Sequence, residues 1–286
     1  MLTLEEYKNE KEYYLNFFKG IDAEKNNFKQ IFDYHFPIVK IQIKYFQKFN
    51  PDVNIDKKEA ENLLNQSNFL FSKYDFSIDK KLLNEFFTEL LQFININCKI
   101  IDKINNDINS LSNPTLNKLK NSYIFSTLSE NISKEEKEKF FLWYGILVPF
   151  YSKISFQIKN QIDLSIWKEN ICPICGESPS IARLDKENGK RFLWCNLCQI
   201  EWAFSRVCCV NCKNTNTDTL KYFYVEEDRT HRVDVCEECK TYIKTCDEQL
   251  ADKKMYLMIE NIITFFLDII SLKNGYKVLE KNENKM

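Results

Sequence analysis

Glycine is scarce in this chain and supplies 5 of its 286 residues. The N-terminal half contains no glycine-rich loop of the kind that cradles a phosphate group. An excess of charge of one sign is also missing, because 40 Lys and Arg residues stand against 41 Asp and Glu residues. A chain that coats nucleic acid or anionic lipid carries a broad positive field. We therefore expect any partner to be recognised by shape.

Long apolar runs are absent as well. The two longest occupy residues 140–151 and 262–270, and Asp268 interrupts the second. Both fall well short of the roughly 20 residues that a helix needs to cross a bilayer, so no membrane span is predicted. The N-terminus has acidic residues and no apolar core followed by small residues, which is unlike a secretory signal. The sequence therefore favours a cytoplasmic protein.

Cysteine, in contrast, is abundant and concentrated. Of the 11 cysteines, only Cys98 lies outside residues 172–246. An odd number of cysteines in a reducing compartment does not suit a disulfide framework, and metal or redox chemistry explains the concentration better. Cys98 occupies an apolar segment with helical spacing, where we expect it to act as a small hydrophobic residue.

Residues 1–168 have the periodicity of amphipathic helices. The segment 82–101, for example, places pairs of apolar residues three to four positions apart, as a buried helix face requires. Pro149 is expected to kink or interrupt a later helix. The helical spacing of apolar residues predicts another helix over residues 250–276, after the cysteine-rich region, and Gly275 is placed to end it.

Two Cys-x-x-Cys pairs frame a predicted hairpin. Cys172 and Cys175 belong to CPICG, and Cys195 and Cys198 follow an apolar stretch. Asn188–Gly189, between the pairs, favours a type I′ turn that would bring the second pair back beside the first. Four thiolates would then converge with the spacing typical of a tetrahedral metal site.

The same pattern repeats directly downstream. The pairs CVNC and CEEC flank two β-rich stretches that the polar segment EEDRT connects. Each Cys-x-x-Cys pair forms a tight turn, or knuckle, and a predicted hairpin already joins consecutive knuckles. Metal sites built from consecutive knuckles therefore need less loop closure than nested or interleaved sites. We therefore predict two separate metal sites: Cys172, Cys175, Cys195 and Cys198 in the first, and Cys209, Cys212, Cys236 and Cys239 in the second.

A site with four cysteine ligands has no open coordination position, which argues against hydrolytic metal catalysis. The metals would hold the ribbons in shape or carry an electron. Zinc and iron both accept this ligand set, and the spacing does not choose between a zinc ribbon and a rubredoxin-like iron centre. Cys208 and Cys246 belong to neither predicted metal site. We expect Cys208 to neighbour the second site and Cys246 to lie at the edge of a helix.

The cysteine-rich region resembles a known family. The segments CPICGESP, RFLWCNLCQIEWAFSRVCCVNC, YFYVEE, VCEECKTYIKT and FFLDIISLKNGY are similar to motifs of the FdhE family, the accessory proteins of formate dehydrogenase. The resemblance covers roughly residues 172–276. It includes the eight predicted metal ligands, together with Glu201, Trp202, Arg206, Tyr242 and Lys244. Three positions depart from the family pattern: Lys213 replaces a usual glycine, and Cys208 and Cys246 are additions.

The resemblance implies a cytoplasmic assembly factor that is not itself an enzyme. Such a factor would bind the catalytic subunit of a formate dehydrogenase while the subunit's molybdenum or tungsten cofactor and iron–sulfur chemistry are completed. In the link between the two ribbons, Glu201 and Arg206 could face this partner. Alternatively, Trp202 could fill the core between the ribbons, with Arg206 as its hydrogen-bonding lid.

Two functions of other classes stay open. A rubredoxin-like electron carrier needs iron and a site near solvent. A nucleic-acid-binding zinc ribbon is less favoured, because residues 172–247 contain 11 Lys and Arg residues against 12 Asp and Glu residues. Each divalent metal bound by four thiolates adds about two further negative charges.

Together these features predict an α+β fold with an N-terminal all-helical domain, two tandem four-cysteine modules of the rubredoxin-like or zinc-ribbon type, and a C-terminal helix. The expected boundaries are 1–168 for the helical domain, 169–206 and 207–247 for the two ribbons, and 248–286 for the C-terminal helix and tail.

Overall fold

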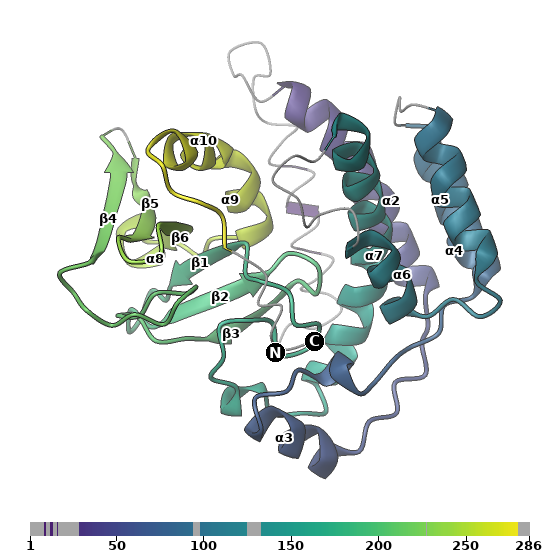
Figure 1. The fold of residues 1–286 in the computed structure, drawn as a ribbon, viewed down its shortest axis with the longest axis horizontal. Helices are drawn as coiled ribbons and strands as arrows, with labels where there is room; N and C mark the ends of the chain where they lie inside the picture. Colours follow the sequence, from purple (N-terminus) through teal and green to yellow (C-terminus); the bar gives the residue numbers. More distant parts are fainter. Residues whose placement is uncertain are drawn as a thin grey trace. The chain divides into compact units, whose positions relative to one another are not determined.

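A computed structural model of the chain describes residues 29–93, 98–124, 133–226 and 228–279, together with four isolated positions, Asn9, Glu12, Tyr13 and Asn16. The chain divides into two compact units (Figure 1). The first unit comprises residues 1–55 and 73–160, and the second comprises residues 56–72 and 161–286.

The first unit is built from helices. They are α2 (Lys29–Lys48), α4 (Lys80–Leu91), α5 (Cys98–Ser110), α6 (Leu116–Ile124) and α7 (Lys134–Lys159). The other helices pack around α7, because its middle is apolar on all sides: Leu142, Trp143, Ile146 and Phe150 are at most 1% exposed. Outside the helices, one isolated β-bridge joins Ser77 to Thr115. The all-helical domain expected over residues 1–168 is thus confirmed only in part, because residues 56–72 and 161–168 belong to the second unit.

Helix α7 runs through Pro149 without the expected interruption. A proline leaves the carbonyl of the residue four positions earlier without its helical donor, here the carbonyl of Gly145. The buried side chain of Gln42 on α2 supplies the missing bond, donating from Nε2 to Gly145 O at 2.9 Å.

The prediction that Cys98 acts as a small hydrophobic residue in the core is wrong, because this residue is exposed at the start of α5. None of the described helices is long and apolar enough to span a membrane.

The second unit contains one six-stranded sheet in the order β3-β2-β1-β6-β5-β4. Its strands are β1 (Ile181–Leu184), β2 (Arg191–Cys195), β3 (Ile200–Ala203), β4 (Leu220–Val225), β5 (Asp228–Cys236) and β6 (Thr241–Asp247). Each half of the sheet repeats one plan: a Cys-x-x-Cys knuckle, a hairpin, a second knuckle and a third strand. Neighbouring strands within each half are antiparallel, whereas β1 and β6 pair in parallel and join the halves.

The shared sheet differs from the predicted arrangement of two ribbon modules in sequence. The third strands, β3 and β6, were not expected, and it is β6 that carries the second half onto the first through its pairing with β1. The prediction of a two-residue turn at Asn188–Gly189 is also wrong. Residues 185–190 form a longer loop in which Asp185 accepts hydrogen bonds from the backbone N–H groups of Glu187 and Asn188. Cys246 lies on β6 and is buried, so its expected place at a helix edge is wrong as well.

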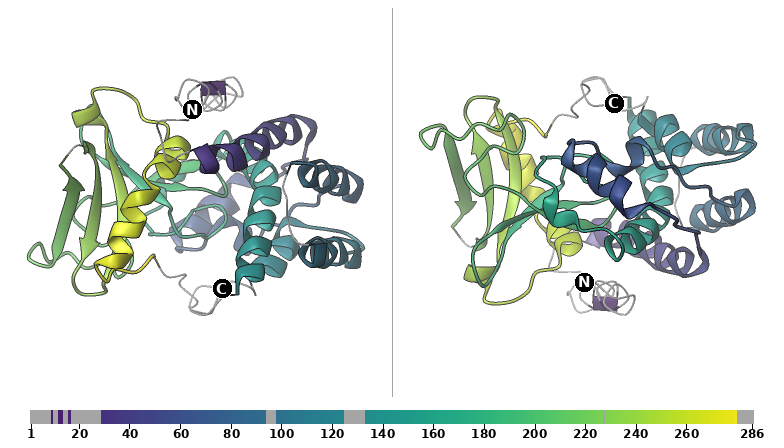
Figure 2. Two further views of the ribbon diagram at one scale, coloured as in Figure 1. Left: turned by 90° about the horizontal axis from the view of Figure 1, so that it is seen from above. Right: turned by 90° about the horizontal axis from the view of Figure 1, so that it is seen from below.

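Short helices complete the second unit. Helices α3 (Lys57–Asn65), α8 (Glu248–Ala251), α9 (Leu257–Ile263) and α10 (Phe265–Lys273) accompany two 3-10 turns, η1 (Leu70–Ser72) and η2 (Leu164–Ile166). Figure 2 shows α9 and α10 lying along the sheet; α9 contacts β1 and β6, and α10 contacts β5 and β6.

The single helix predicted over residues 250–276 is therefore divided. One break separates α8, which ends at Ala251, from α9, which begins at Leu257. The other falls at Thr264, whose hydroxyl donates to the backbone carbonyl of Glu260 at 2.5 Å. A threonine that bonds to the preceding turn in this way bends a helix. The break at Thr264 lets Leu267 of α10 reach the core formed by Val233, Val235 and Tyr242.

Candidate metal centres

The eight predicted cysteines form two separate groups of four. Within each group, the four sulfur atoms all lie within 4.8 Å of one another. Three separations across the hairpins measure 3.6 to 3.8 Å, those of Cys175–Cys195, Cys209–Cys239 and Cys212–Cys236. A disulfide needs about 2.05 Å. Four sulfurs placed tetrahedrally at about 2.3 Å from a zinc ion lie about 3.8 Å apart. The spacing therefore suits a central metal ion, and each group could bind one.

All four knuckles share one backbone conformation. The residue after the second cysteine of each pair has a positive φ, and its N–H donates to the carbonyl of the first cysteine; these residues are Gly176, Gln199, Lys213 and Lys240. Lys213 thus adopts the left-handed conformation itself, with a φ of 61°. Non-glycine residues pay about 1–2 kcal/mol for this conformation. Three of the knuckles therefore store strain that the convergence of the cysteines must offset.

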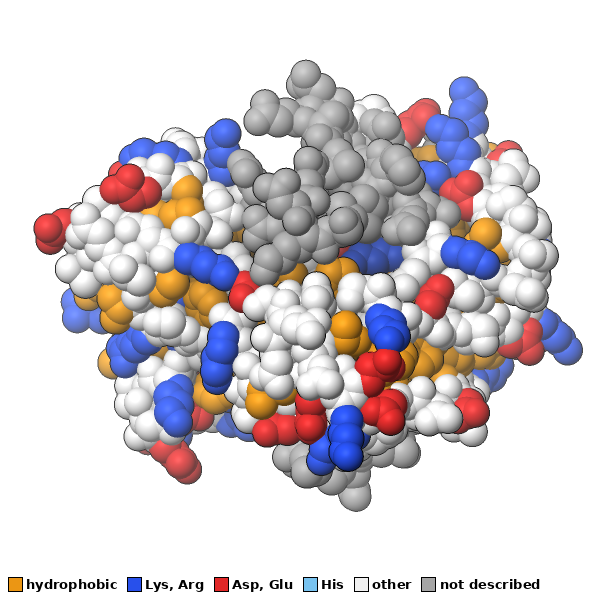
Figure 3. Space-filling model, turned by 60° about the horizontal axis from the view of Figure 1, so that its bottom comes forward, with side chains coloured by type: hydrophobic (Ala, Val, Ile, Leu, Met, Phe, Trp, Pro, Cys, Tyr) orange, Lys and Arg blue, Asp and Glu red, His pale blue; other side chains and the backbone are white. Residues whose placement is uncertain are grey.

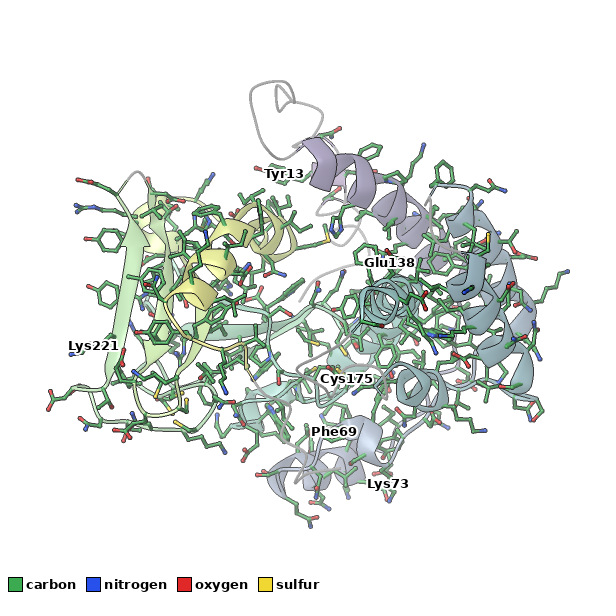
Figure 4. All side chains as sticks on the ribbon, turned by 45° about the horizontal axis from the view of Figure 1, so that its top comes forward. Tyr13, Phe69, Lys73, Glu138, Cys175 and Lys221 are labelled. Carbon is green, nitrogen blue, oxygen red and sulfur yellow. The ribbon has the colours of Figure 1, made fainter. Side chains whose placement is uncertain are left out.

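The first knuckle requires a glycine for a second reason. A Cβ atom on Gly176, whose φ is +74°, would lie 2.8 Å from the ring of Phe69. Phe69 precedes η1, which is bonded to the knuckle: Leu70 N donates to Pro173 O at 2.9 Å and Phe71 N donates to Ile174 O at 2.8 Å. Figure 4 shows Phe69 beside Cys175. Residues 69–72, far away in sequence, therefore cover the first centre, and no sequence motif indicated this contact.

The first centre is closed to solvent, since all four of its cysteines are 0% exposed. Burial raises the pKa of the Cys195 and Cys198 thiols, and hydrogen bonds with the neighbouring cysteines add to the effect. Four buried thiolates are tolerable only beside a cation, because an uncompensated buried charge is strongly unfavourable. Metal binding at this centre would accordingly release protons.

The second centre is partly open. Cys209 and Cys236 are buried, but Cys212 is exposed and Cys239 is half-buried. Although burial opposes it, hydrogen bonds from the hydroxyl and backbone of Thr241 lower the pKa of the Cys239 thiol to about 7. Burial raises the pKa of Cys209. The two centres therefore differ in how far solvent reaches their ligands.

The three residues proposed for partner binding have different environments. Trp202 is buried and donates from Nε1 to the backbone carbonyl of Glu169 at 3.0 Å. Glu201 is half-buried and forms an ion pair with Arg183. Arg206 is exposed and donates to the carbonyl of Gly189 at 3.3 Å. Of the three, only Arg206 is an exposed side chain.

The buried arginine at the junction of the two halves is Arg191, which was not among the predicted site residues. Arg191 is 4% exposed, and its guanidinium donates to the backbone carbonyls of Ser205 and Cys208. These bonds hold the link between the two centres. Burial lowers the pKa of Arg191. Its Nε atom is buried without a hydrogen-bond partner among the described residues. The only sequence sign of this role is a charged residue at the start of an otherwise apolar strand.

A cavity of about 270 Å³ borders the second centre. It is lined by Cys209 and Cys236 and by several cationic side chains, Arg191, Arg206, Lys221 and Arg232. Asp234 is the acidic residue of its lining and pairs with Arg232 at 2.9 Å. Cations therefore predominate among the charged side chains of a cavity whose lining is otherwise mainly apolar. Lys221 lies on β4, at the edge of the sheet (Figure 4).

Comparison with known proteins confirms the resemblance to the FdhE family. The model of the FdhE central domain matches residues 171–206. A protein named FdhE homolog from Aquifex aeolicus is 33% identical over 166 residues, which span 56% of each chain. The FdhE homolog of Haemophilus ducreyi is 23% identical over 260 residues, covering 89% of this chain and 82% of that protein.

The crystal structure of the FdhE protein from Pseudomonas aeruginosa has a similar fold, with a TM-score of 0.65. The match covers 94% of this chain and 92% of that chain at 16% identity. The mixed arrangement of helices and sheet is thus shared by the two proteins.

Proposed function

We propose that each group of four cysteines binds one metal ion, iron or zinc, through four thiolates. The sulfur–sulfur separations of 3.6 to 3.8 Å are the observation that carries this proposal. The four repeated N–H···O=C bonds of the knuckles support it, because they orient both cysteines of each pair toward one point. Metal analysis of the purified chain tests it, and absence of metal from both groups would contradict it.

The chain acts, in this proposal, as a cytoplasmic accessory factor in the maturation of a formate dehydrogenase. The resemblance to the FdhE family supports this role. The chain would bind the catalytic subunit of that enzyme and perform no chemistry of its own. A centre with four protein ligands leaves no position for substrate, which agrees with a binding function.

The partner surface would lie around the cavity beside the second centre. Its rim includes the exposed side chains of Arg206, Val207 and Tyr222. Tyrosine and arginine are enriched among the residues that dominate binding energy at protein interfaces. Arg232 stacks on Tyr222, 4.9 Å from the ring centroid, and so holds the ring in place. A side chain ordered before binding loses little entropy on association.

The cationic lining favours an acidic segment of the partner. Four cationic side chains and one acidic side chain line the cavity, and the Nε of Arg191 is a buried donor with no hydrogen-bond partner in the described part of the chain. This preference is local, because basic and acidic side chains are both spread over the face shown in Figure 3. A local basic site suits a carboxylate-bearing peptide, whereas nucleic acid requires a continuous positive track.

The Arg206→Ala variant tests this surface. Its side chain is exposed and makes one hydrogen bond of 3.3 Å, so metal content and melting temperature should change little. Binding of the formate dehydrogenase catalytic subunit should weaken by about 1–3 kcal/mol, or roughly 5- to 150-fold. Lys273→Ala is the matched control, since Lys273 is an exposed cation on α10 outside the cavity lining.

The two roles of Arg206 give different outcomes. If Arg206 is a lid on the core, the variant will lose thermal stability, and binding will fall only in proportion to the unfolded fraction. A stable variant with unchanged binding would reject Arg206 as a contact. Failure of the wild-type chain to capture the catalytic subunit would reject the proposed partner itself.

Electron transfer is a second candidate function, because Cys212 of the second centre is exposed. A rubredoxin-like carrier needs iron at such a site. Iron found at the second centre, with a reversible one-electron redox transition, would favour this function. Zinc at both centres would exclude it.

A further inference from the structure

A third group of possible metal ligands lies in the second unit, away from both four-cysteine centres. It consists of His231 on β5, Cys246 on β6 and Glu260 on α9. Their ligand atoms all lie within 4.8 Å of one another. The three residues are 8%, 0% and 7% exposed, respectively. Three different side chains that can each bind a transition metal thus meet inside the fold.

Strand register accounts for this meeting. His231 and Cys246 are direct partners in the antiparallel pairing of β5 with β6, so their side chains project from the same face of the sheet. Helix α9 covers this face and buries Leu257, Met258 and Ile259 together with Glu260. Glu260 is therefore a carboxylate on the apolar side of the helix, which is a costly place for a charge without a partner.

The imidazole of His231 is oriented as a metal ligand would be. Its Nδ1 is held by the carboxylate of Asp228, and Thr230 Oγ1 lies 3.2 Å from the same nitrogen. The other nitrogen, Nε2, lies 2.8 Å from Glu260 Oε2 and faces the space shared with Cys246. Metal-binding histidines commonly bond one ring nitrogen to a carboxylate in this way, which fixes the ring and leaves the other nitrogen for the ion.

We propose that His231, Cys246 and Glu260 bind a divalent transition metal of the zinc class, through Nε2, Sγ and a carboxylate oxygen. The mixture of nitrogen, sulfur and oxygen ligands suits Zn²⁺ and its neighbours, whereas Ca²⁺ and Mg²⁺ prefer oxygen alone. Binding replaces the proton shared between Nε2 and Glu260 and releases the thiol proton of Cys246. Three protein ligands leave one tetrahedral position for water.

The charge balance favours such a site in the interior. One thiolate, one carboxylate and a neutral imidazole neutralise a divalent cation, whereas four thiolates leave a net charge of about −2. Neighbouring charged groups are already engaged. Glu248 accepts from Arg183 at 3.0 Å and from the N–H of Met255 at 2.8 Å. Lys244 donates to Asp268 at 2.7 Å. Because these neighbours already have partners, the proposed ion is assigned to His231, Cys246 and Glu260 alone.

A purely structural role is the competing explanation. In that case His231 links Asp228 and Glu260 by hydrogen bonds, no ion enters, and the thiol of Cys246 is only a small side chain in the core. The two explanations differ in the number of metal ions that the chain binds and in whether that number depends on Cys246.

The test uses the full chain, stripped of metal and reloaded with Co²⁺ or Zn²⁺, with bound metal counted by native mass spectrometry. Wild type should bind three ions, and Cys246→Ala should bind two. Cys208→Ala is the matched control and should bind three, because Cys208 is also a buried cysteine but belongs to none of the three groups. The difference in Co²⁺ absorption between wild type and Cys246→Ala should show charge transfer from one thiolate.

Two further variants protect the test against a folding defect. Glu260→Gln and His231→Gln keep polar side chains of similar size, and each should lose one ion while the two four-cysteine centres stay loaded. Two ions in the wild type, or three in Cys246→Ala, would overturn the proposal. The count does not depend on any formate dehydrogenase, so this result is separate from that of the partner-binding experiment.

Discussion

Replacement of Gly176 by alanine tests how the first centre is built. Gly176 combines a φ of +74° with a close approach to Phe69, whose ring atoms lie 2.8 to 3.0 Å from the position of an added Cβ. Gly275 offers a matched control, because its φ of +83° is similar but nothing lies within 4 Å of an added Cβ. The two substitutions share the conformational penalty and differ in the steric one.

The magnitude follows from these two terms. A left-handed alanine costs about 1–2 kcal/mol, so Gly275→Ala should lower the free energy of unfolding by that amount. Gly176→Ala should cost about 1–3 kcal/mol more, the usual penalty for overpacking a tight site. Its total should be roughly 2–5 kcal/mol. The clash would also push η1 away from the knuckle to which Leu70 and Phe71 donate their bonds.

Denaturant unfolding at a fixed free metal concentration measures these costs, because bound metal itself stabilises the folded state. A double variant then isolates the clash. Phe69→Leu removes the ring edge that an added Cβ would meet, so Gly176→Ala should cost about 1–3 kcal/mol less in the Phe69→Leu background than alone. Equal losses for Gly176→Ala and Gly275→Ala would refute the argument, as would strict additivity of the Phe69 and Gly176 substitutions.

Two remaining predictions concern metal release and pH. A chelator should remove metal from the second centre faster than from the first, since Cys212 is exposed whereas all four cysteines of the first centre are buried; Cys212→Ser should abolish the fast phase, and a fast phase that persists would contradict the assignment. In the helical unit, hydrogen bonds from Lys44 and Tyr45 hold the pKa of Glu89 below its usual 4.5. A lowered carboxyl pKa stabilises the fold above the unfolded value and loses that effect as pH falls through the folded value. Glu89→Gln should therefore cost about 0.5–1 kcal/mol at pH 7 and progressively less below about pH 4.5, as measured by unfolding across this range; a difference independent of pH would contradict it.

The grouping of the cysteines could be predicted because it depends on local sequence. Each Cys-x-x-Cys pair is a short turn, and a hairpin joins consecutive pairs, so few chain conformations bring them together. The helices α2, α4, α5, α6 and α7 could likewise be expected from the spacing of apolar residues. Pro149 does not interrupt α7, because a distant side chain, Gln42, donates to the carbonyl that proline leaves without a donor.

The pairing that joins the two halves could not be predicted in the same way. Strand β6 follows the last knuckle and pairs in parallel with β1, some sixty residues earlier in the chain. Nothing in the local pattern of either strand indicates that partner. Cys246 illustrates the consequence. Its place opposite His231 depends on the register of β5 and β6, which the local sequence does not determine.

If both four-cysteine centres bind metal, we expect them to have different roles because different residues cover them, although their ligands are the same. Both have the same knuckles, the same backbone bonds and similar sulfur separations. Residues 69–72 close the first centre, whereas the second opens on a basic cavity and exposes Cys212. The closed centre presents none of its ligands to a partner, so its expected role is to stabilise the fold. The open centre can also present an ordered surface to a partner, so substitutions that spare stability and impair binding should fall around the second.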